Sequence, residues 1–91
     1  MVNTEQDGDN FYKAAENFLN EKRYEEAMKA YGEAIDIGCS HMAEALHMRG
    51  TFTYLMGDST GALEDFKRAL EIKPDYVQIY VKRATIYMEQ G

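Results

Sequence analysis

Two stretches of the chain, "RYEEAMKAYGEAIDIGC" (residues 23–39) and "DSTGALEDFKRALEIKP" (residues 58–74), align with a constant shift of 35 residues. At matching positions both carry a small residue, then a large one, then a small one, as in Ala27, Tyr31 and Ala34. A second pair, "ALHMRGTFTYLMG" (residues 45–57) and "IYVKRATIYMEQG" (residues 79–91), aligns with a shift of 34. Because the two shifts agree to one residue, a unit of about 34 residues recurs along the chain.

The apolar residues within each unit have helical spacing. Ala27, Tyr31, Ala34 and Ile35 fall on one face of a helix, and the second stretch repeats the pattern. This periodicity, together with a single proline in the whole chain, predicts an all-α protein. The expected helices cover residues 9–21, 24–37, 41–56, 59–72 and 76–90.

Polar residues mark the expected helix starts. Ser40 and Asp75 are predicted N-caps, and Gly57-Asp58 is predicted to form a turn that leads into the next helix. Residues 1–7 have no apolar periodicity, so we expect a disordered leader there and a folded domain over residues 8–91.

Composition narrows the class of protein. The length of 91 residues suits one domain, and no apolar run approaches the length of a membrane span. The net charge of −6 argues against nucleic acid and against an anionic membrane surface, since both bind basic faces. The single cysteine cannot form an internal disulfide, which favours a reducing, cytoplasmic setting.

No residues form a recognisable catalytic or metal-binding set. His41 and His47 are six residues apart, do not share a helix face, and are expected at the surface. Cys39 has no basic neighbour to activate it as a nucleophile. The sequence "GDSTG" (residues 57–61) lacks the lysine and the spacing of a phosphate-binding loop. We therefore expect neither an enzyme nor a bound cofactor.

Helix–turn–helix units of this length, with small residues at fixed places, resemble the tetratricopeptide (TPR) repeat. The residues that carry the resemblance are Gly50, Ala62, Phe66, Ala69 and Pro74 in the second unit, and Ala15, Ala27, Tyr31 and Ala34 in the first, where Cys39 replaces the proline. The resemblance implies an α-solenoid of antiparallel helix pairs. We expect repeats over residues 8–41 and 43–76 and half a repeat over 77–91. Gly91 matches Gly57, so the second helix of that last pair is expected to follow in a longer parent protein.

A narrower resemblance is carried by "RGTFTYLMGDSTGALEDF" (residues 49–66) and "VQIYVKRATIYMEQG" (residues 77–91). Both look like internal repeats of the large TPR import receptors of the fungal mitochondrial outer membrane. That resemblance implies preproteins with internal hydrophobic targeting signals as cargo. It also implies a parent protein anchored in that membrane and facing the cytosol.

In the TPR family the first helix of each repeat lines a concave groove that binds peptides. The matching residues here are Tyr12, Lys13, Glu16, Leu19, Glu44, His47, Met48, Thr51, Tyr54, Leu55, Gln78, Val81, Lys82, Thr85 and Met88. Tyrosines and methionines among them offer large, adaptable apolar contacts. Alternatively, several of these side chains pack between adjacent repeats, Leu55 and Met88 above all.

The resemblance also excludes one ligand class at these repeats. TPR domains that clamp the C-terminal carboxylate of cytosolic chaperones carry basic and amide residues at five groove positions. The residues at those positions here are Tyr12, Glu16, Met48, Gln78 and Lys82. Only Lys82 suits a carboxylate, and Glu16 would repel one at close range.

The sequence thus predicts a protein-interaction module whose groove binds a peptide or protein segment with apolar anchors, with Glu16 and Glu44 favouring a basic rim on the ligand. The alternative is a structural segment of a longer TPR scaffold or co-chaperone that binds its partner elsewhere. We also expect the last helix to expose Ile79, Ile86 and Tyr87 and to promote self-association through that face.

Overall fold

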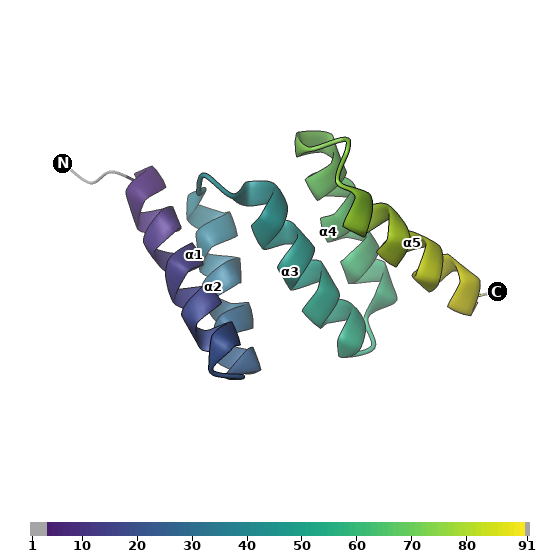
Figure 1. Ribbon diagram of the computed structural model, residues 1–91, viewed down its shortest axis with the longest axis horizontal. Helices are drawn as coiled ribbons and strands as arrows, with labels where there is room; N and C mark the ends of the chain where they lie inside the picture. The colour runs from purple at the N-terminus through teal and green to yellow at the C-terminus, as the bar shows by residue number, and fades with distance from the viewer. Residues whose placement is uncertain (1–3, 91) are drawn as a thin grey trace.

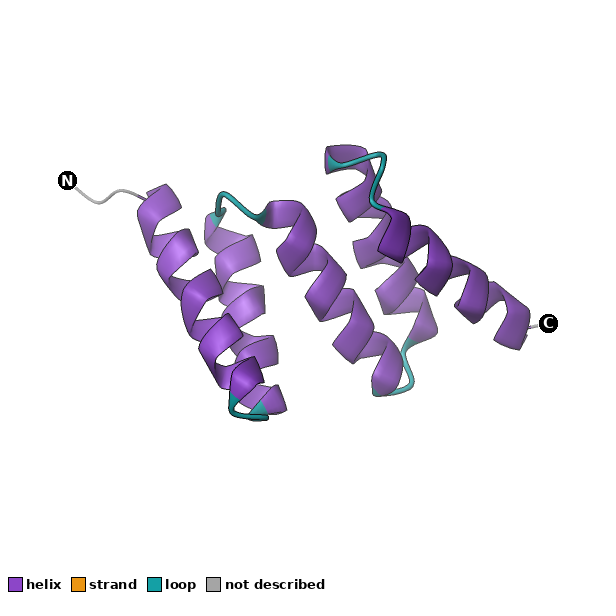
Figure 2. Cartoon of the chain, viewed as in Figure 1, coloured by secondary structure: helices purple, strands orange, loops and turns teal. Residues whose placement is uncertain are grey.

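The computed structural model describes residues 4–90, and within that range the all-α prediction is confirmed. Short loops join the helices (Figure 2). In chain order the helices are α1 (Thr4–Asn20), α2 (Tyr24–Ile37), α3 (Met42–Leu55), α4 (Ser59–Ile72) and α5 (Val77–Gln90), as Figure 1 shows. None of the helices described is both long enough and apolar enough to cross a membrane.

The helices form antiparallel pairs along an elongated molecule of about 50 × 28 × 18 Å. The most extensive packing joins α1 to α2 and α3 to α4, while α2 also packs against α3 and α5 contacts α4. Figure 1 shows α2 and α4 behind α1, α3 and α5, so the first helix of each pair faces the viewer. This is the layered arrangement expected of an α-solenoid.

The core follows the small–large–small order of the repeated stretches. Ala27 and Ala34 are fully buried on either side of Tyr31 in α2. The matching residues of α4, Ala62, Phe66 and Ala69, are also fully buried. The alanines let neighbouring helices approach closely, and the rings fill the space beside these contacts. The core therefore confirms the packing predicted from the repeat.

Helix α1 begins at Thr4, so the prediction of a disordered leader over residues 1–7 was wrong for residues 4–7, and residues 1–3 lie outside the described range. The cause is tertiary docking on the loop between α2 and α3. Gly8 is buried against Gly38, and the Asp9 carboxylate accepts hydrogen bonds from the backbone N–H and the hydroxyl of Ser40, at 2.6 and 2.7 Å. These bonds lower the pKa of Asp9.

Of the predicted helix starts, only the one at Asp58 is confirmed. Gly57 adopts a φ of 97°, and the Asp58 carboxylate then caps α4 by accepting from the Gly61 N–H at 2.8 Å. Ser40 is not the N-cap of α3, because its polar groups bind Asp9 and His41 directly precedes the helix. Asp75 is not the cap of α5, since it lies two residues before the first helical residue.

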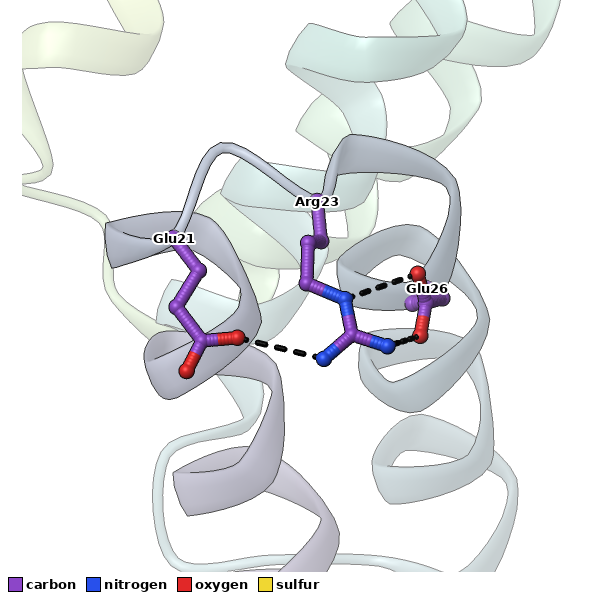
Figure 3. A network of polar contacts seen from close by, with 3 residues as sticks. All are labelled: Glu21, Arg23 and Glu26. Atoms are coloured by element: carbon purple, nitrogen blue, oxygen red, sulfur yellow. Dashed lines mark hydrogen bonds and ion pairs between the residues drawn. The ribbon is translucent and has the colours of Figure 1, made fainter.

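An exposed polar network closes the turn between α1 and α2 (Figure 3). The Arg23 guanidinium bonds to both carboxylate oxygens of Glu26 and to one oxygen of Glu21, and it lies 4.8 Å from the centre of the Phe18 ring. All three charged side chains are about half exposed, so the network contributes little stability beyond orienting the turn.

The expected exposed face of the last helix was wrong for two of its three residues. Ile79 and Ile86 are fully buried, because they contribute to the same core as Phe66 and Ala69. Tyr87 is exposed as predicted. Self-association through what remains exposed on α5 stays a prediction.

Candidate functional site

A hollow of about 490 Å³ lies between α1 and α3. The two helices supply its sides, Tyr31 reaches it from α2, and Tyr76 reaches it from the loop before α5. Its lining consists of Tyr12, Lys13, Glu16, Asn17, Leu19, Asn20, Tyr31, Glu44, His47, Met48 and Tyr76. We call this hollow the groove.

The structure brings together part of the predicted groove set. The members that line the groove are Tyr12, Lys13, Glu16, Leu19, Glu44, His47 and Met48. They sit on α1 and α3 at helical spacing, so each helix turns one face towards the other. Their part in binding a ligand stays a prediction.

The other predicted residues lie outside the groove. The hydroxyls of Thr51 and Thr85 donate to carbonyls of their own helices, at 2.8 and 3.0 Å. Tyr54 donates its hydroxyl to Glu89 and so links α3 to α5. On α5, Val81 is exposed and Lys82 is half-buried, and neither lines the groove.

Leu55 and Met88, for which packing between repeats was the alternative to a place in the groove, are exposed. Met88 is 81% exposed near the end of α5. Leu55 lies in a separate apolar hollow of about 430 Å³ between the start of α2 and the end of α3. Tyr24, Met28, Phe52 and Met56 also line that second hollow. Leu55 therefore belongs to a different surface from Met48, although both are on α3.

Aromatic rings from different parts of the chain meet in the groove. The Tyr12 ring stands edge-on to Tyr31, with the ring centres 5.7 Å apart, and lies 4.8 Å from the His41 ring. The His47 ring is edge-on to Tyr76 at 5.0 Å, and its Nδ1 hydrogen-bonds the Tyr76 hydroxyl at 3.0 Å. These contacts fix the positions of the groove's tyrosines.

The electrostatic environment of the groove is negative near Tyr12. Burial raises the pKa of Tyr12, and the carboxylates of Glu16 and Glu44 raise it further. Burial, with a smaller effect of Glu16, raises the pKa of Tyr31 to about 12, and burial and Glu44 raise that of Tyr76. The three phenols therefore stay neutral at physiological pH, and Glu16 and Glu44 set the sign of the local potential.

His47 was expected at the surface and is half-buried instead. Its pKa is lowered, chiefly by burial and also by the positive charge of Lys82, while Glu44 opposes the shift. Its Nε2 is enclosed and has no hydrogen-bond partner within the described part of the chain. The protonated ring would carry positive charge at this enclosed nitrogen with no acceptor to stabilise it, so the neutral ring is favoured.

Lowering the pH should therefore destabilise the fold through His47. The unfolded histidine takes up a proton near pH 6.5, whereas the folded one does so only at lower pH. The free energy of unfolding should fall as the pH drops below about 6.5 and level off below the folded pKa. Urea denaturation from pH 7.5 to 5 measures this, and subtracting the profile of His47→Gln removes the contribution of other groups. Identical profiles for the two proteins would contradict the assignment.

Tyr31 and Tyr76 are groove residues that the sequence did not reveal. Tyr31 occupies the core position that Phe66 fills in α4, and only its hydroxyl distinguishes it as a residue that could reach a polar surface. Tyr76 was expected to begin the last helix, but it lies in the loop directly before α5, outside the first-helix positions from which the groove set was taken.

Within residues 4–90 we find neither a metal-binding cluster nor a reactive thiol near the groove. Among residues 4–90 no group of three or more histidine, cysteine or acidic side chains could hold a metal ion. Cys39 is buried, and burial raises the pKa of its thiol, so the reactive thiolate is disfavoured.

The stacked helix pairs and the groove on the first helices define a helical-repeat protein of the solenoid class. Comparison with protein families gives the particular repeat. Residues 9–37 match the family described as tetratricopeptide repeat, and residues 53–91 match the one described as TPR repeat. The chain belongs to the tetratricopeptide repeat family, whose repeats are protein-interaction modules.

Curated relatives include a co-chaperone, a DnaJ homolog and an import receptor. The tetratricopeptide repeat and J domain-containing co-chaperone DNJ1 of Cryptococcus neoformans is 38% identical over 77 residues, which is 85% of this chain and 15% of that protein. The mitochondrial import receptor subunit TOM70 of Homo sapiens is 30% identical over 83 residues, 87% of this chain and 14% of the receptor. The DnaJ homolog subfamily C member 7 homolog of Schizosaccharomyces pombe is 42% identical over 59 residues, 64% of this chain and 12% of that protein. The chain thus spans a small fraction of each relative's length.

Proposed function

We propose that the groove between α1 and α3 binds a peptide or protein segment through apolar anchor side chains. The observation that carries the proposal is the hollow itself, of a size that accepts several side chains and lined by residues of two successive repeats. A segment bound there would contact both repeats at once, which suits an extended or helical peptide.

The groove's chemistry suits apolar anchors at one part and positive charge at another. Leu19 and Met48 offer apolar contact area, and the flexible methionine adapts to different partner shapes. Glu16 and Glu44 lie beside this area and disfavour acidic ligands. A peptide that ends in a free carboxylate among acidic residues, as in chaperone tails, should therefore bind poorly.

The import-receptor relative supports mitochondrial preproteins as the ligand, and the internal hydrophobic targeting signals that the resemblance implies for them would supply apolar anchors. If so, the parent protein works at the cytosolic face of the mitochondrial outer membrane. The co-chaperone relative supports the other function, in which this part of the chain is a structural segment of a longer TPR scaffold or co-chaperone. The two functions differ in whether the groove binds a peptide directly.

The test compares two methionines, Met48 within α3 and Met56 directly after the end of that helix. Met48 lines the groove, whereas Met56 lies in the second hollow and is 75% exposed. Met48→Glu should weaken binding of a labelled, amidated peptide with paired leucines and one lysine at least tenfold, because it puts a charge on the apolar contact surface. Met56→Glu should leave the dissociation constant within about twofold of the parent value. Fluorescence anisotropy measures both, well below the melting temperatures found by circular dichroism.

Equal loss of affinity in the two methionine variants would contradict a groove site and favour a diffuse apolar contact. Absence of binding to the unmodified protein at millimolar concentration would favour the scaffold function instead. A further arm uses a peptide with an acidic, free C-terminus, which should bind more weakly than the leucine–lysine peptide.

A further inference from the structure

The part of the groove nearest Tyr12 differs from the part formed by Leu19 and Met48. We call it the tyrosine pocket and define it by Tyr12, Tyr31, Tyr76, Glu16 and Glu44. Its tyrosines come from α1, from α2 and from the loop before α5, so it exists only when both repeats are packed together. It combines aromatic rings with carboxylates, whereas the rest of the lining consists of Leu19, Met48, two asparagines, Lys13 and His47.

Both components of the tyrosine pocket attract a cation. Aromatic faces carry a negative quadrupole, which draws ammonium and guanidinium groups to within about 6 Å of the ring centre. The charges of Glu16 and Glu44 act on Tyr12, and one or the other also acts on Tyr31 and on Tyr76. The carboxylates therefore lie close enough to the rings to reinforce their attraction for a positive group.

The neighbouring positive charges leave this attraction in place. Lys13 lines the groove but is exposed, so its flexible side chain can point into solvent. Lys82 acts on His47 and is not among the residues that line the groove. His47 is held neutral by its enclosed position and by that same lysine. The lining thus carries two carboxylates, of which Glu16 is exposed and Glu44 is half-buried, against the one exposed ammonium group of Lys13.

We propose that the tyrosine pocket receives one basic side chain, lysine or arginine, from the bound peptide, while an apolar anchor beside it contacts Leu19 and Met48. The inference rests on the proposed function, because it assigns the second half of the same ligand. The ligand must then carry a basic residue next to an apolar one, and the tyrosine pocket is the subsite for the basic residue. It also gives Tyr31 and Tyr76 a part in recognition.

The experiment compares peptides that differ at one position. The leucine–lysine peptide described above is matched with versions in which norleucine or glutamate replaces the lysine. For the unmodified protein at low salt, the lysine peptide should bind about tenfold tighter than the norleucine peptide. The reason is that lysine gains two partly exposed charge pairs and the contacts with the rings, which norleucine lacks. The glutamate peptide should bind more weakly than either. Isothermal titration calorimetry gives the dissociation constants.

Two sets of variants show which groups produce the preference. In the double variant Glu16→Gln with Glu44→Gln, the lysine-to-norleucine ratio should fall to within about twofold of one, while affinity for the norleucine peptide is retained. Tyr12→Leu should reduce the ratio roughly twofold, and Tyr12→Phe, which keeps the ring, should preserve it. The phenylalanine variant also controls for folding, since it keeps the edge-on contact with Tyr31.

The outcomes separate this inference from the function on which it rests. Equal binding of the lysine and norleucine peptides to the unmodified protein would overturn the inference alone, because apolar anchoring would then suffice. A lysine preference that survives in the double glutamine variant would place the cation elsewhere and also overturn it. If none of the peptides binds, the proposed function fails and the tyrosine pocket loses its ligand with it.

Discussion

Replacing Asp65 with alanine should lower the free energy of unfolding by about 2–4 kcal/mol. Asp65 is only 7% exposed on α4, and its carboxylate accepts two hydrogen bonds from Arg49 on α3, from Nε at 2.9 Å and from the terminal nitrogen at 2.8 Å. The alanine variant leaves the Arg49 guanidinium without this partner in a largely enclosed place, where its side chain is 26% exposed. Urea denaturation measures the loss.

The neighbouring residue supplies the control. Glu64 is exposed on the same helix, so Glu64→Ala should change stability by no more than about 0.5 kcal/mol. The double variant Arg49→Met with Asp65→Leu should recover part of the loss, because it removes both charges together. If Asp65→Ala changes stability as little as Glu64→Ala, the Arg49–Asp65 ion pair does not hold α3 against α4. Other contacts would then fix the position of α3 beside the groove.

Replacing Gly8 with alanine should destabilise the protein by about 1–3 kcal/mol, even though alanine favours helices. A Cβ atom on Gly8 would lie 1.8 Å from the carbonyl oxygen of Gly38 and 2.7 Å from its carbonyl carbon. Because the obstacle is backbone, α1 would have to move away from the loop that joins α2 to α3. That movement would also strain the bonds between Asp9 and Ser40.

Gly32 is the matched control for this prediction. It lies within α2, and a Cβ atom there would meet nothing within 4 Å. Gly32→Ala should therefore raise stability by up to about 1 kcal/mol, through helix propensity alone. Thermal melts of the two variants should shift in opposite directions. A stabilising Gly8→Ala would show that the first turn of α1 is not docked as described.

Most of the fold could be predicted because it is local and repeated. The small–large–small order around Tyr31 and Phe66 predicts both the second helices and their buried faces, and the bounds of α2 and α4 agree with the prediction. The start of α1 could not be predicted, since the polar sequence before residue 9 has no apolar period. It is helical because of contacts with Gly38 and Ser40, some thirty residues away.

The groove could be predicted only where it is built from helix positions. Tyr12, Glu16, Glu44 and Met48 line it because their places on α1 and α3 turn them towards the same space. Tyr76 was not predicted as a groove residue, because it was assigned to the start of the last helix and instead reaches the groove from the loop before α5. The Arg49–Asp65 ion pair was not predicted either. The aligned residues of the first unit are Ala14 and Ala30, so the pair is not part of the repeated pattern.

The central claim is that the groove between α1 and α3 is where the chain binds its partner, and amide chemical-shift mapping tests it most directly. Titrating the leucine–lysine peptide into isotope-labelled protein should shift the amides of residues 12–19, 44–48 and 76 first and most strongly. The amides near Tyr24 and Met56, in the second hollow, should remain in place. Shifts confined to that second hollow or to the exposed side of α5, with none in α1, would contradict the account.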